Sequence, residues 1–183
     1  ASRATDIPAF FSKWFHNRLM AGYIRWTNPF NASQIQYVSF QKTRVIVFWS
    51  KNPKPLIRYL PEIESKGINY YFQFTLNDYE QEGLEPNVAP LAQRVETFKN
   101  LVERLGKKRV IWRYDPLMLT DTLTVDVLLD RIARVASLLR GYTERLVISF
   151  ADIGSYKKVQ NNLAREKVRY QEFTPKLMTE LAQ

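Results

Sequence analysis

The chain has 183 residues, of which 45% are hydrophobic and 14% aromatic, and its formal net charge is +9. This length and composition suit one globular domain with a sizeable core, and no run of about 18 apolar residues is present to predict a membrane span. The chain has no cysteine and one histidine, which excludes disulfides, cysteine-ligated zinc or iron–sulfur clusters and a thiol nucleophile within this chain.

The first predicted element is a helix that begins after Asp6 and runs to about Ala21. Asp6 can accept a hydrogen bond as the N-cap, and Pro8 fits the first turn of a helix. The residues spaced to form its apolar face are Phe11, Trp14, Phe15 and Leu19. After this helix, the stretches Tyr23–Trp26 and Gln36–Phe40 can pair as a small hairpin.

Beyond residue 40 the sequence alternates between strand-like and helix-like segments. Four runs rich in β-branched and aromatic residues predict parallel strands covered on both faces: Val45–Ser50, Tyr70–Leu76, Val110–Tyr114 and Leu146–Ala151. Helices are predicted to begin near Pro55, at Pro90, after Thr124, near Ser155 and at Thr174. The clearest follows Pro90, because its apolar residues step by three or four: Leu91, Val95, Phe98, Val102 and Leu105.

Four of the six glycines each close a helix-like segment and precede a strand-like one: Gly22, Gly67, Gly106 and Gly141. They lie 35 to 45 residues apart, which is close to the length of one strand–helix unit in barrel proteins. The sequence therefore predicts an α/β protein, a partial or open (β/α) barrel of the TIM type with about five to six parallel strand–helix units. Residues 1–183 are expected to form a single domain of this kind, with the hairpin beside the barrel.

Polar residues recur where the predicted strands end. They are Ser50, Lys51 and Asn52, then Thr75, Asn77 and Asp78, then Arg113 and Asp115, then Ser149 and Asp152, with Arg3, Thr5 and Asp6 just before the first helix. In a parallel barrel these positions meet at the rim formed by the carboxyl ends of the strands, where active sites form. This rim is the predicted ligand site.

Strand parity predicts which of these side chains point into the barrel. Phe72 and Phe74 share the face expected to carry helices, so Gln73 should point inward, and Arg113 and Asp115 share a face of the next strand. An arginine and a glutamine inside a barrel are costly unless they are paired or face a wet cavity. Arg113 is suited to clamp an anion, because its planar fork fits carboxylate and phosphate groups.

Several of these residues also have a purely structural interpretation. Arg113 and Asp115 can form an internal salt bridge that ties strands together. Asp6 can serve only as a helix cap, and Asn52, which precedes Pro53, can serve only to shape a turn. Each alternative stays open from the sequence.

Other conspicuous side chains are assigned to packing or to the surface. Lys51 can simply point to solvent. His16 lies within the first helix and fits a surface or packing position better than a catalytic base, since it is the chain's one histidine and has no evident partner. Trp14, Trp49 and Trp112 are expected in the core.

The basic excess lies in the first third of the chain. Residues 1–66 carry ten Lys or Arg against three Asp or Glu, which favours nucleic acid, phosphorylated metabolites or an acidic protein as partners, although a solvated surface explains it equally well. A second basic stretch, Tyr156–Tyr170, can follow a nucleic-acid backbone or form a solvated helix. Glycine-rich phosphate motifs are missing, so an anion site would use Arg, Lys and helix N-termini.

A set of segments covers nearly the whole chain in order: Ala1–Phe10, Asn28–Asn31, Val47–Pro53, Tyr71–Thr75, Val110–Pro116, Tyr142–Arg145 and Ile148–Phe150. These segments resemble an uncharacterised bacterial family, a domain of unknown function whose members typically begin with Ser-Arg-Arg-Thr-Asp-Ile-Pro. That family is similar to the radical S-adenosylmethionine barrels, including the spore photoproduct lyase group. The resemblance implies a barrel whose C-terminal segment usually carries a cysteine cluster.

The chain departs from this family pattern in two ways. Ala4 stands where the family tends to have a second arginine, and no cysteine is present. The resemblance implies that the family's C-terminal region would follow Gln183 and that the first strand is clipped. Without cysteine, this chain offers no iron–sulfur ligands, so S-adenosylmethionine stays a cofactor candidate through the resemblance alone.

Three functions fit these observations. The first is an enzyme, or part of one, that binds an anionic or nucleotide-like ligand at the rim. The ligand-binding candidates are Arg3, Thr5, Lys51, Asn52, Gln73, Thr75, Arg113 and Ser149, the candidates for proton transfer are Asp6, Asp115 and Asp152, and no metal ligands are predicted.

The second function is a nucleic-acid-binding module that uses the basic N-terminal third. The third is a partner subunit that completes a barrel with another chain, since about five units leave exposed sheet edges that a partner chain or a missing C-terminal region would cover. In each case we expect a cytoplasmic protein without membrane contact, because disulfides are excluded and no apolar span is present.

Overall fold

A four-stranded parallel sheet forms the centre of the computed structural model, which describes residues 5–28 and 30–182. The sheet order is β3-β4-β5-β7, with β3 at Val45–Ser50, β4 at Asn69–Thr75, β5 at Val110–Leu117 and β7 at Leu146–Phe150. All three neighbouring pairs are parallel. The spatial order of the four strands is the same as their order along the chain. The four predicted strands are thus present and paired in parallel, with ends that differ by at most a few residues.

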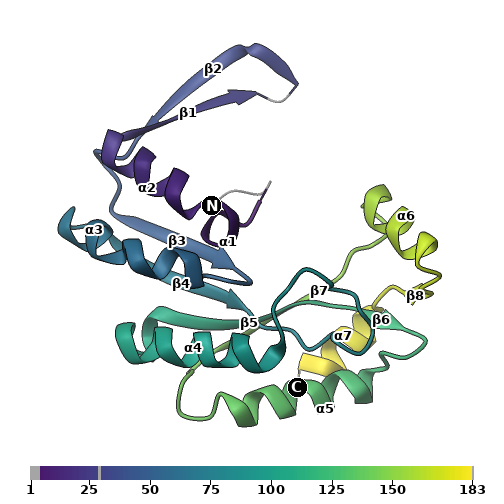
Figure 1. Cartoon of the computed structure of the whole chain (residues 1–183). Coiled ribbons are helices and arrows are strands. Elements are labelled where there is room, and N and C mark those ends of the chain that lie inside the picture. Colours follow the sequence, from purple (N-terminus) through teal and green to yellow (C-terminus); the bar gives the residue numbers. More distant parts are fainter. Residues whose placement is uncertain (1–4, 29, 183) are drawn as a thin grey trace.

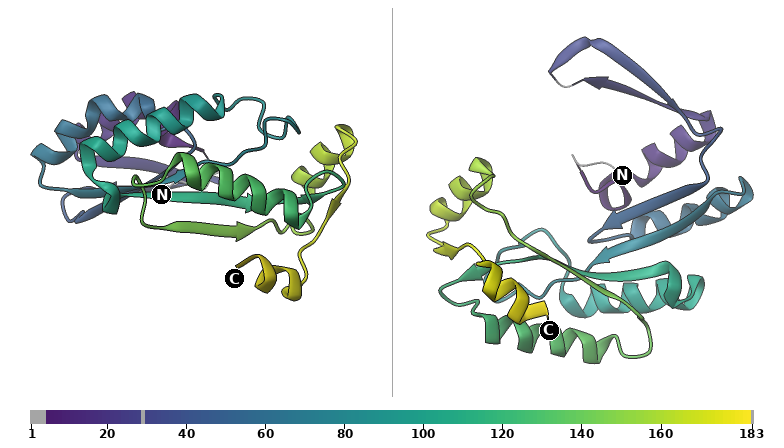
Figure 2. Two further views of the ribbon diagram at one scale, coloured as in Figure 1. Left: turned by 90° about the horizontal axis from the view of Figure 1, so that it is seen from below. Right: turned by 180° about the vertical axis from the view of Figure 1, so that it is seen from behind.

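The helices that connect these strands lie on one face of the sheet (Figures 1 and 2). The connections are η1 (Lys54–Tyr59) with α3 (Leu60–Ser65), then α4 (Leu91–Leu105) with η2 (Lys107–Arg109), then α5 (Val125–Leu138). Each connection crosses from the end of one strand to the start of the next, as parallel pairing requires. The predicted α/β class is confirmed.

The predicted barrel of five to six units is not confirmed. Within residues 5–28 and 30–182 the parallel sheet contains four strands, and β3 and β7 are its two edges. The segment after β7 leads to β8 (Tyr170–Gln171), which pairs antiparallel with β6 (Leu119–Thr120) and so does not extend the parallel sheet. The face of the sheet opposite α3, α4 and α5 is called the open face below.

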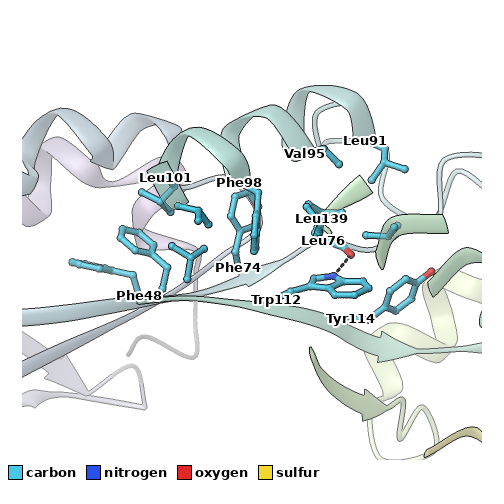
Figure 3. Packing of buried hydrophobic residues seen from close by; sticks show 14 of the residues in the cluster. Phe48, Phe74, Leu76, Leu91, Val95, Phe98, Leu101, Trp112, Tyr114 and Leu139 are labelled. Carbon is cyan, nitrogen blue, oxygen red and sulfur yellow. Dashed lines mark hydrogen bonds between the residues drawn. The ribbon is translucent and has the colours of Figure 1, made fainter. Parts of the chain in front are cut away.

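The core fills the space between the sheet and these helices (Figure 3). Phe74 of β4 packs on Phe98 of α4 with ring centroids 5.4 Å apart, and Phe48 of β3 stacks on Phe72 at 5.1 Å. Trp112 of β5 is 2% exposed and donates its indole N–H to the carbonyl of Leu76 at 3.0 Å, which satisfies its one polar group. Trp112 is therefore a core residue, as the sequence predicts.

The helices present the predicted apolar stripes to this core. The five apolar residues of the helix after Pro90, from Leu91 to Leu105, are all at most 8% exposed. Helix α5 begins after Thr124 as predicted, and Thr124 caps it by accepting a hydrogen bond from the backbone N–H of Val127. The regular spacing of these residues explains why both helices could be recognised from the sequence.

The predicted first helix is two helices, α1 (Ile7–Phe10) and α2 (Ser12–Ala21), because the chain turns at Phe11. Phe15 and Leu19 are buried as predicted, but Phe11 and Trp14 are 46% and 41% exposed. The prediction of a common apolar face, with Trp14 in the core, is wrong, since Phe11 lies at the break and Trp14 is turned about 100° from Phe15 around α2. Gly22, with φ 83°, ends α2 in the left-handed conformation.

The predicted hairpin is confirmed and is longer than expected. Strands β1 (Tyr23–Asn28) and β2 (Asn31–Ser39) pair antiparallel, and they extend beyond α2 away from the four-stranded sheet (Figure 1). Every residue of β2 is exposed. At the base of the hairpin, Phe40 packs against Phe15 with ring centroids 6.1 Å apart, which fixes the hairpin to the core.

The C-terminal part consists of α6 (Lys157–Arg165) and α7 (Pro175–Ala182), close to the predicted helices. Phe173 packs on Phe150 of β7 with ring centroids 4.8 Å apart, which holds this part against the end of the sheet. Among the helices in the described ranges, none combines the length and the apolar character needed to cross a bilayer.

Candidate functional site

Polar side chains from neighbouring strands meet on the open face. The register places Trp49 beside Gln73 and Thr75 beside Arg113. Gln73 alternates with the fully buried Phe72 and Phe74, so it points away from the helices as the strand parity predicts. The open face is therefore polar toward the carboxyl ends of the strands.

Arg113 is the centre of this group. Its guanidinium donates two hydrogen bonds to Oδ2 of Asp115, from Nε at 3.0 Å and from Nη2 at 2.8 Å, and one from Nη1 to Oε1 of Gln73 at 2.5 Å. The side chains of Arg113 and Asp115 are only 12% and 13% exposed. A two-bond pair at this depth holds the guanidinium in a defined plane.

Trp49 covers one side of that plane. The guanidinium carbon of Arg113 lies 4.3 Å from the centroid of the Trp49 ring, within the range of a cation–π contact. The indole N–H of Trp49 donates to Oγ1 of Thr75 at 3.1 Å, which fixes the orientation of the ring. Trp49 is nevertheless 50% exposed, so the prediction that it lies in the core is wrong: at its position the strand turns the side chain to the open face.

Asp115 connects β5 to β7 and to the loop after β4. Its Oδ1 accepts a hydrogen bond from the hydroxyl of Ser149, and its backbone N–H donates to Oδ1 of Asn77 at 2.8 Å. Asn77 in turn donates from Nδ2 to the carbonyl of Asp115 at 3.1 Å. The buried Asn77 thus fixes the backbone at the residue whose carboxylate holds Arg113.

Lys51 at the end of β3 and Glu85 in the loop after β4 form a further contact at this end of the sheet. The ammonium of Lys51 contacts Oε1 of Glu85, and Nδ2 of Asn77 donates to the same oxygen at 3.1 Å. The side chain of Glu85 is 15% exposed, and its Oε2 is buried without a hydrogen-bond partner among the described residues. Lys51 therefore does not simply point to solvent.

Asp6 holds the end of β3 in place. Its Oδ1 accepts from the backbone N–H of Ala9 at 3.0 Å, which makes Asp6 the N-cap of α1. Its Oδ2 accepts from the hydroxyl of Ser50 at 3.0 Å and from the backbone N–H of Lys51 at 2.8 Å. With three accepted hydrogen bonds, the carboxylate of Asp6 ties the N-terminal helix to the end of β3.

Two buried arginines support the long loop between β4 and α4. Arg94, 3% exposed, donates to the carbonyls of Asn77 at 2.9 Å and Ala89 at 2.7 Å, and burial lowers the pKa of its guanidinium. Arg131, 8% exposed, donates to the carbonyl of Asp78 at 2.6 Å and to Oε1 of Glu82 at 2.6 Å. These bonds give an irregular loop a fixed shape at the rim.

Tyrosines beneath this loop are also buried. The hydroxyl of Tyr79 donates to the carbonyl of Pro116 at 2.8 Å, and the hydroxyl of Tyr114 accepts from the backbone N–H of Asp78 at 3.3 Å. Burial raises the pKa of both phenols above their ordinary value. The two side chains therefore stay neutral at physiological pH and support the loop.

A small cavity lies under the same loop, lined by Tyr79, Glu80, Glu85, Pro90 and Arg94 among others. Its volume is about 180 Å³, whereas ligand pockets typically measure roughly 300 to 1,000 Å³. The candidate site is therefore the open face around Arg113 and Trp49, and not this cavity.

The structure joins most of the sequence-predicted candidates into one network of hydrogen bonds and one cation–π contact, which we call the rim network. Its predicted members are Asp6, Lys51, Gln73, Thr75, Arg113, Asp115 and Ser149. Its further members are Trp49, Ser50, Asn77 and Glu85. The network crosses all four strands of the sheet.

Three candidates within the described residues are not joined to the network through their side chains. Asn52 accepts from the backbone N–H of Lys54 at 3.3 Å and so shapes a turn, which fits its structural interpretation. Asp152 is exposed and accepts from the backbone N–H of Ser155 at 3.3 Å. Thr5 is exposed just before α1, and Arg3 lies outside the described residues.

His16 takes the packing position that the sequence favours. Its ring stacks on Tyr59 with centroids 4.6 Å apart, and its Nε2 lies 3.7 Å from Oε1 of Glu62. These three residues are not members of the rim network, and their contacts link α2 to the segment after β3.

Glu85 is the network member that sequence reasoning missed most clearly. It lies ten residues beyond the end of β4, in a loop whose path no local pattern indicates. Ser50 and Asn77 were visible as polar residues at strand ends, but a buried bridging role cannot be read from spacing. Trp49 could have been recognised, because strand parity puts it on the same face as Gln73 of the neighbouring strand.

The part of the chain that the structure describes contains no group of three or more His, Cys, Asp or Glu arranged to hold a metal ion. The family model described as a domain of unknown function, DUF1848, matches residues 1–183, so the chain belongs to this family. Neither the curated proteins nor the solved structures include a match to the chain.

Proposed function

We propose that this member of the DUF1848 family binds a nucleotide-like anion on its open face, as an enzyme or as part of one. The observation that carries the proposal is the stacked pair of Trp49 and Arg113, held by Thr75, Gln73 and Asp115 on the face opposite α3, α4 and α5. A fixed, half-exposed indole offers a planar surface on which a nucleobase can stack.

The donor count of Arg113 supports an anionic group on the ligand. A guanidinium has five N–H donors, and contacts within the described residues use three of them. The guanidinium lies against the half-exposed Trp49 ring, so in this proposal one ligand places its base on the indole and its phosphate or carboxylate on the guanidinium.

Among the three candidate aspartates, Asp115 is the one best placed to act on such a ligand. Asp6 holds α1 and the end of β3, and it forms no hydrogen bond with Arg113 among the described residues. Asp152 is exposed and outside the rim network. Asp115 lies next to Arg113 on the open face and shares a hydrogen bond with Ser149, so in this proposal it positions Arg113 and exchanges protons with the ligand.

The architecture in this proposal is part of a (β/α) barrel. Four parallel strands in chain order, connecting helices on one face and polar residues at the carboxyl ends of the strands all support it. The residues of this chain do not fit an iron–sulfur cluster, because thiolates are its usual ligands and the chain has none. No part of the proposal depends on such a cluster or on S-adenosylmethionine.

Binding of the four ribonucleoside monophosphates, measured by isothermal titration calorimetry, tests the proposal. We expect at least one of them to bind the wild type, and Trp49→Ala and Arg113→Ala each to weaken that binding about tenfold or more. Trp14→Ala is the matched control, because Trp14 is 41% exposed and lies on α2 outside the rim network.

Stability measurements on the same variants separate a ligand site from a purely structural pair. If Arg113→Ala unfolds more easily and nucleotide binding, extrapolated to the folded fraction, is unchanged, Arg113 and Asp115 form an internal salt bridge only. The absence of binding by any of the four nucleotides to the wild type would also count against the proposal.

A partner that covers the open face is the second candidate role, and one observation favours it. Parallel sheets are almost always covered on both faces, whereas here Val45, on the edge strand β3 and on the same face as Trp49, is 51% exposed. Light scattering of the purified chain tests this role. A larger species than one chain would support self-association, and a monomer at all concentrations would oppose it.

A further inference from the structure

The hairpin β1–β2 carries an exposed aromatic surface that the rim network does not use. Tyr23 and Tyr37 lie on one face, with exposed fractions of 41% and 66% and ring centroids 5.7 Å apart. Arg25 is paired directly with Tyr37 across the two strands, so it lies on the same face, next to Tyr37. We call Tyr23, Arg25 and Tyr37 the hairpin platform.

The opposite face of the hairpin is also exposed and apolar. Trp26 is 45% exposed and Val38 is 52% exposed on that face. An isolated two-stranded hairpin is only marginally stable in water, and exposed aromatic residues on both faces are unusual without a partner. The hairpin is thus suited to contact another molecule.

The positive charge around the hairpin indicates what kind of molecule that partner is. Residues 7–61 contain eight Lys or Arg and no Asp or Glu. Six of these basic residues are exposed: Lys13, Arg25, Lys42, Arg44, Lys54 and Arg58. Lys42 and Arg44 directly follow β2 at the base of the hairpin. A basic segment without a single acidic residue favours a polyanion.

We propose that the hairpin binds single-stranded nucleic acid. Bases stack on Tyr23 and Tyr37 of the hairpin platform, and Arg25, Lys42 and Arg44 contact the phosphates along the strand. Single-stranded nucleic acid fits better than a duplex, because stacking on exposed aromatic rings requires bases that are not already paired. The proposal concerns a surface separate from the open face, so either one can be correct without the other.

Fluorescence anisotropy with a labelled single-stranded DNA oligonucleotide of mixed sequence tests the proposal on the full chain. Wild-type affinity should fall as salt rises, with a log–log slope of about −2 if three phosphates are contacted. Tyr37→Ala should weaken binding about tenfold, and Tyr37→Phe should leave it near the wild-type value, because phenylalanine keeps the ring that stacks. Arg25→Ala should reduce both the affinity and the salt slope.

Tyr156→Ala and Arg140→Ala are the matched controls. Both residues are exposed and lie outside the hairpin, on the segments at α6 and after α5. They should bind the oligonucleotide like the wild type. If Tyr156→Ala weakens binding and Tyr37→Ala does not, the basic stretch around α6 is the binding surface and the proposal is overturned.

Two competitor molecules decide the class of partner. We expect the single strand to bind at least about tenfold more tightly than the same sequence as a duplex, and more tightly than polyglutamate of equal charge. Equal affinity for polyglutamate would mean that charge alone drives binding and that an acidic protein fits as well, which overturns the proposal. Equal or tighter binding of the duplex overturns it too. Circular dichroism melting curves of all variants confirm that an effect reflects contact and not unfolding.

Discussion

At the scale of single residues, the pairing of Arg113 with Asp115 matters most, because it fixes a cation on the face opposite α3, α4 and α5. The pair is buried to nearly nine-tenths and is held from three sides by Gln73, Ser149 and Trp49. A charge at this depth is tolerated because its partner is close and its hydrogen bonds are made. The same burial makes each partner sensitive to removal of the other.

We expect Asp115→Ala to lower the free energy of unfolding by about 3 kcal/mol, since it leaves the guanidinium of Arg113 buried without its carboxylate. Urea denaturation followed by circular dichroism measures this change. Asp152→Ala is the control, because its carboxylate is exposed, and it should change stability by less than about 0.5 kcal/mol. Similar losses in the two variants would show that Asp115 is not part of a tightly coupled pair.

Tyr114 gives a second prediction at this scale, through pH. Burial raises the pKa of its phenol above the ordinary value of 10.0, so the folded state favours the neutral side chain. The resulting stabilisation is complete below pH 10.0 and is lost progressively as the pH rises above it, because the unfolded chain ionises first.

The urea concentration at the unfolding midpoint should therefore decrease as the pH is raised from about 9 to about 11. The decrease should be less steep in Tyr114→Phe, which has no phenol at this position to ionise. Tyr37→Phe is the control, because Tyr37 is 66% exposed. It should keep the wild-type dependence on pH. An unchanged slope in Tyr114→Phe would mean that ionisation of this phenol does not limit alkaline stability.

At the scale of elements, the loop between β4 and α4 shows how irregular backbone is held at the rim. Arg131 reaches from α5 to the carbonyl of Asp78 and to the side chains of Gln81 and Glu82. A helix that follows the loop by more than thirty residues thus fixes its shape. The loop then presents Asn77 and Glu85 to the rim network.

We expect Arg131→Met to increase amide hydrogen exchange across residues 76–90, because the carbonyl of Asp78 and the carboxylate of Glu82 lose their donors. Exchange in the core of α4 should change much less. Arg140→Ala is the control, since Arg140 is exposed at the end of the same helix region. If exchange in the loop is unaffected by Arg131→Met, other contacts determine its shape.

The elements differ in how well the sequence predicts them. Strands β3, β4, β5 and β7 and helix α4 were predictable because hydrophobic spacing decides both, and the hairpin because two apolar runs flank a polar turn. The break at Phe11 was not predictable from the sequence, since nothing in the local pattern distinguishes a kinked helix from a continuous one. Trp49 was misassigned because a large aromatic residue was placed in the core without applying the strand parity that correctly placed Gln73.

At the scale of the whole molecule, the connecting helices α3, α4 and α5 lie on one face of a parallel sheet (Figure 1). Polar residues gather at the carboxyl ends of its strands. The sequence predicts the four parallel strands, the strand–helix repeat and seven of the members of the rim network. It does not predict the number of strands in the sheet, because closure depends on long-range pairing that spacing does not encode. It also does not indicate Glu85, whose contact with Lys51 joins residues 34 positions apart.

The open face and the hairpin lie in different parts of the molecule and offer different chemistry. The open face holds one fixed arginine beside one indole, which suits a small nucleotide-like ligand. The hairpin platform is flat, basic and exposed, which suits a polymer. Variants on one surface should leave binding at the other unchanged.

Indole N–H resonances in a ¹⁵N–¹H correlation spectrum test the central claim most directly, because the chain has four tryptophans in four different settings. On addition of the nucleotide that binds, the signal of Trp49 should shift, since its N–H is held by Thr75 at the ligand site. The signals of Trp14, Trp26 and the buried Trp112 should stay in place. A shift of Trp26 without a shift of Trp49, or no shift at a saturating nucleotide concentration, would contradict the assignment of the open face as the ligand site.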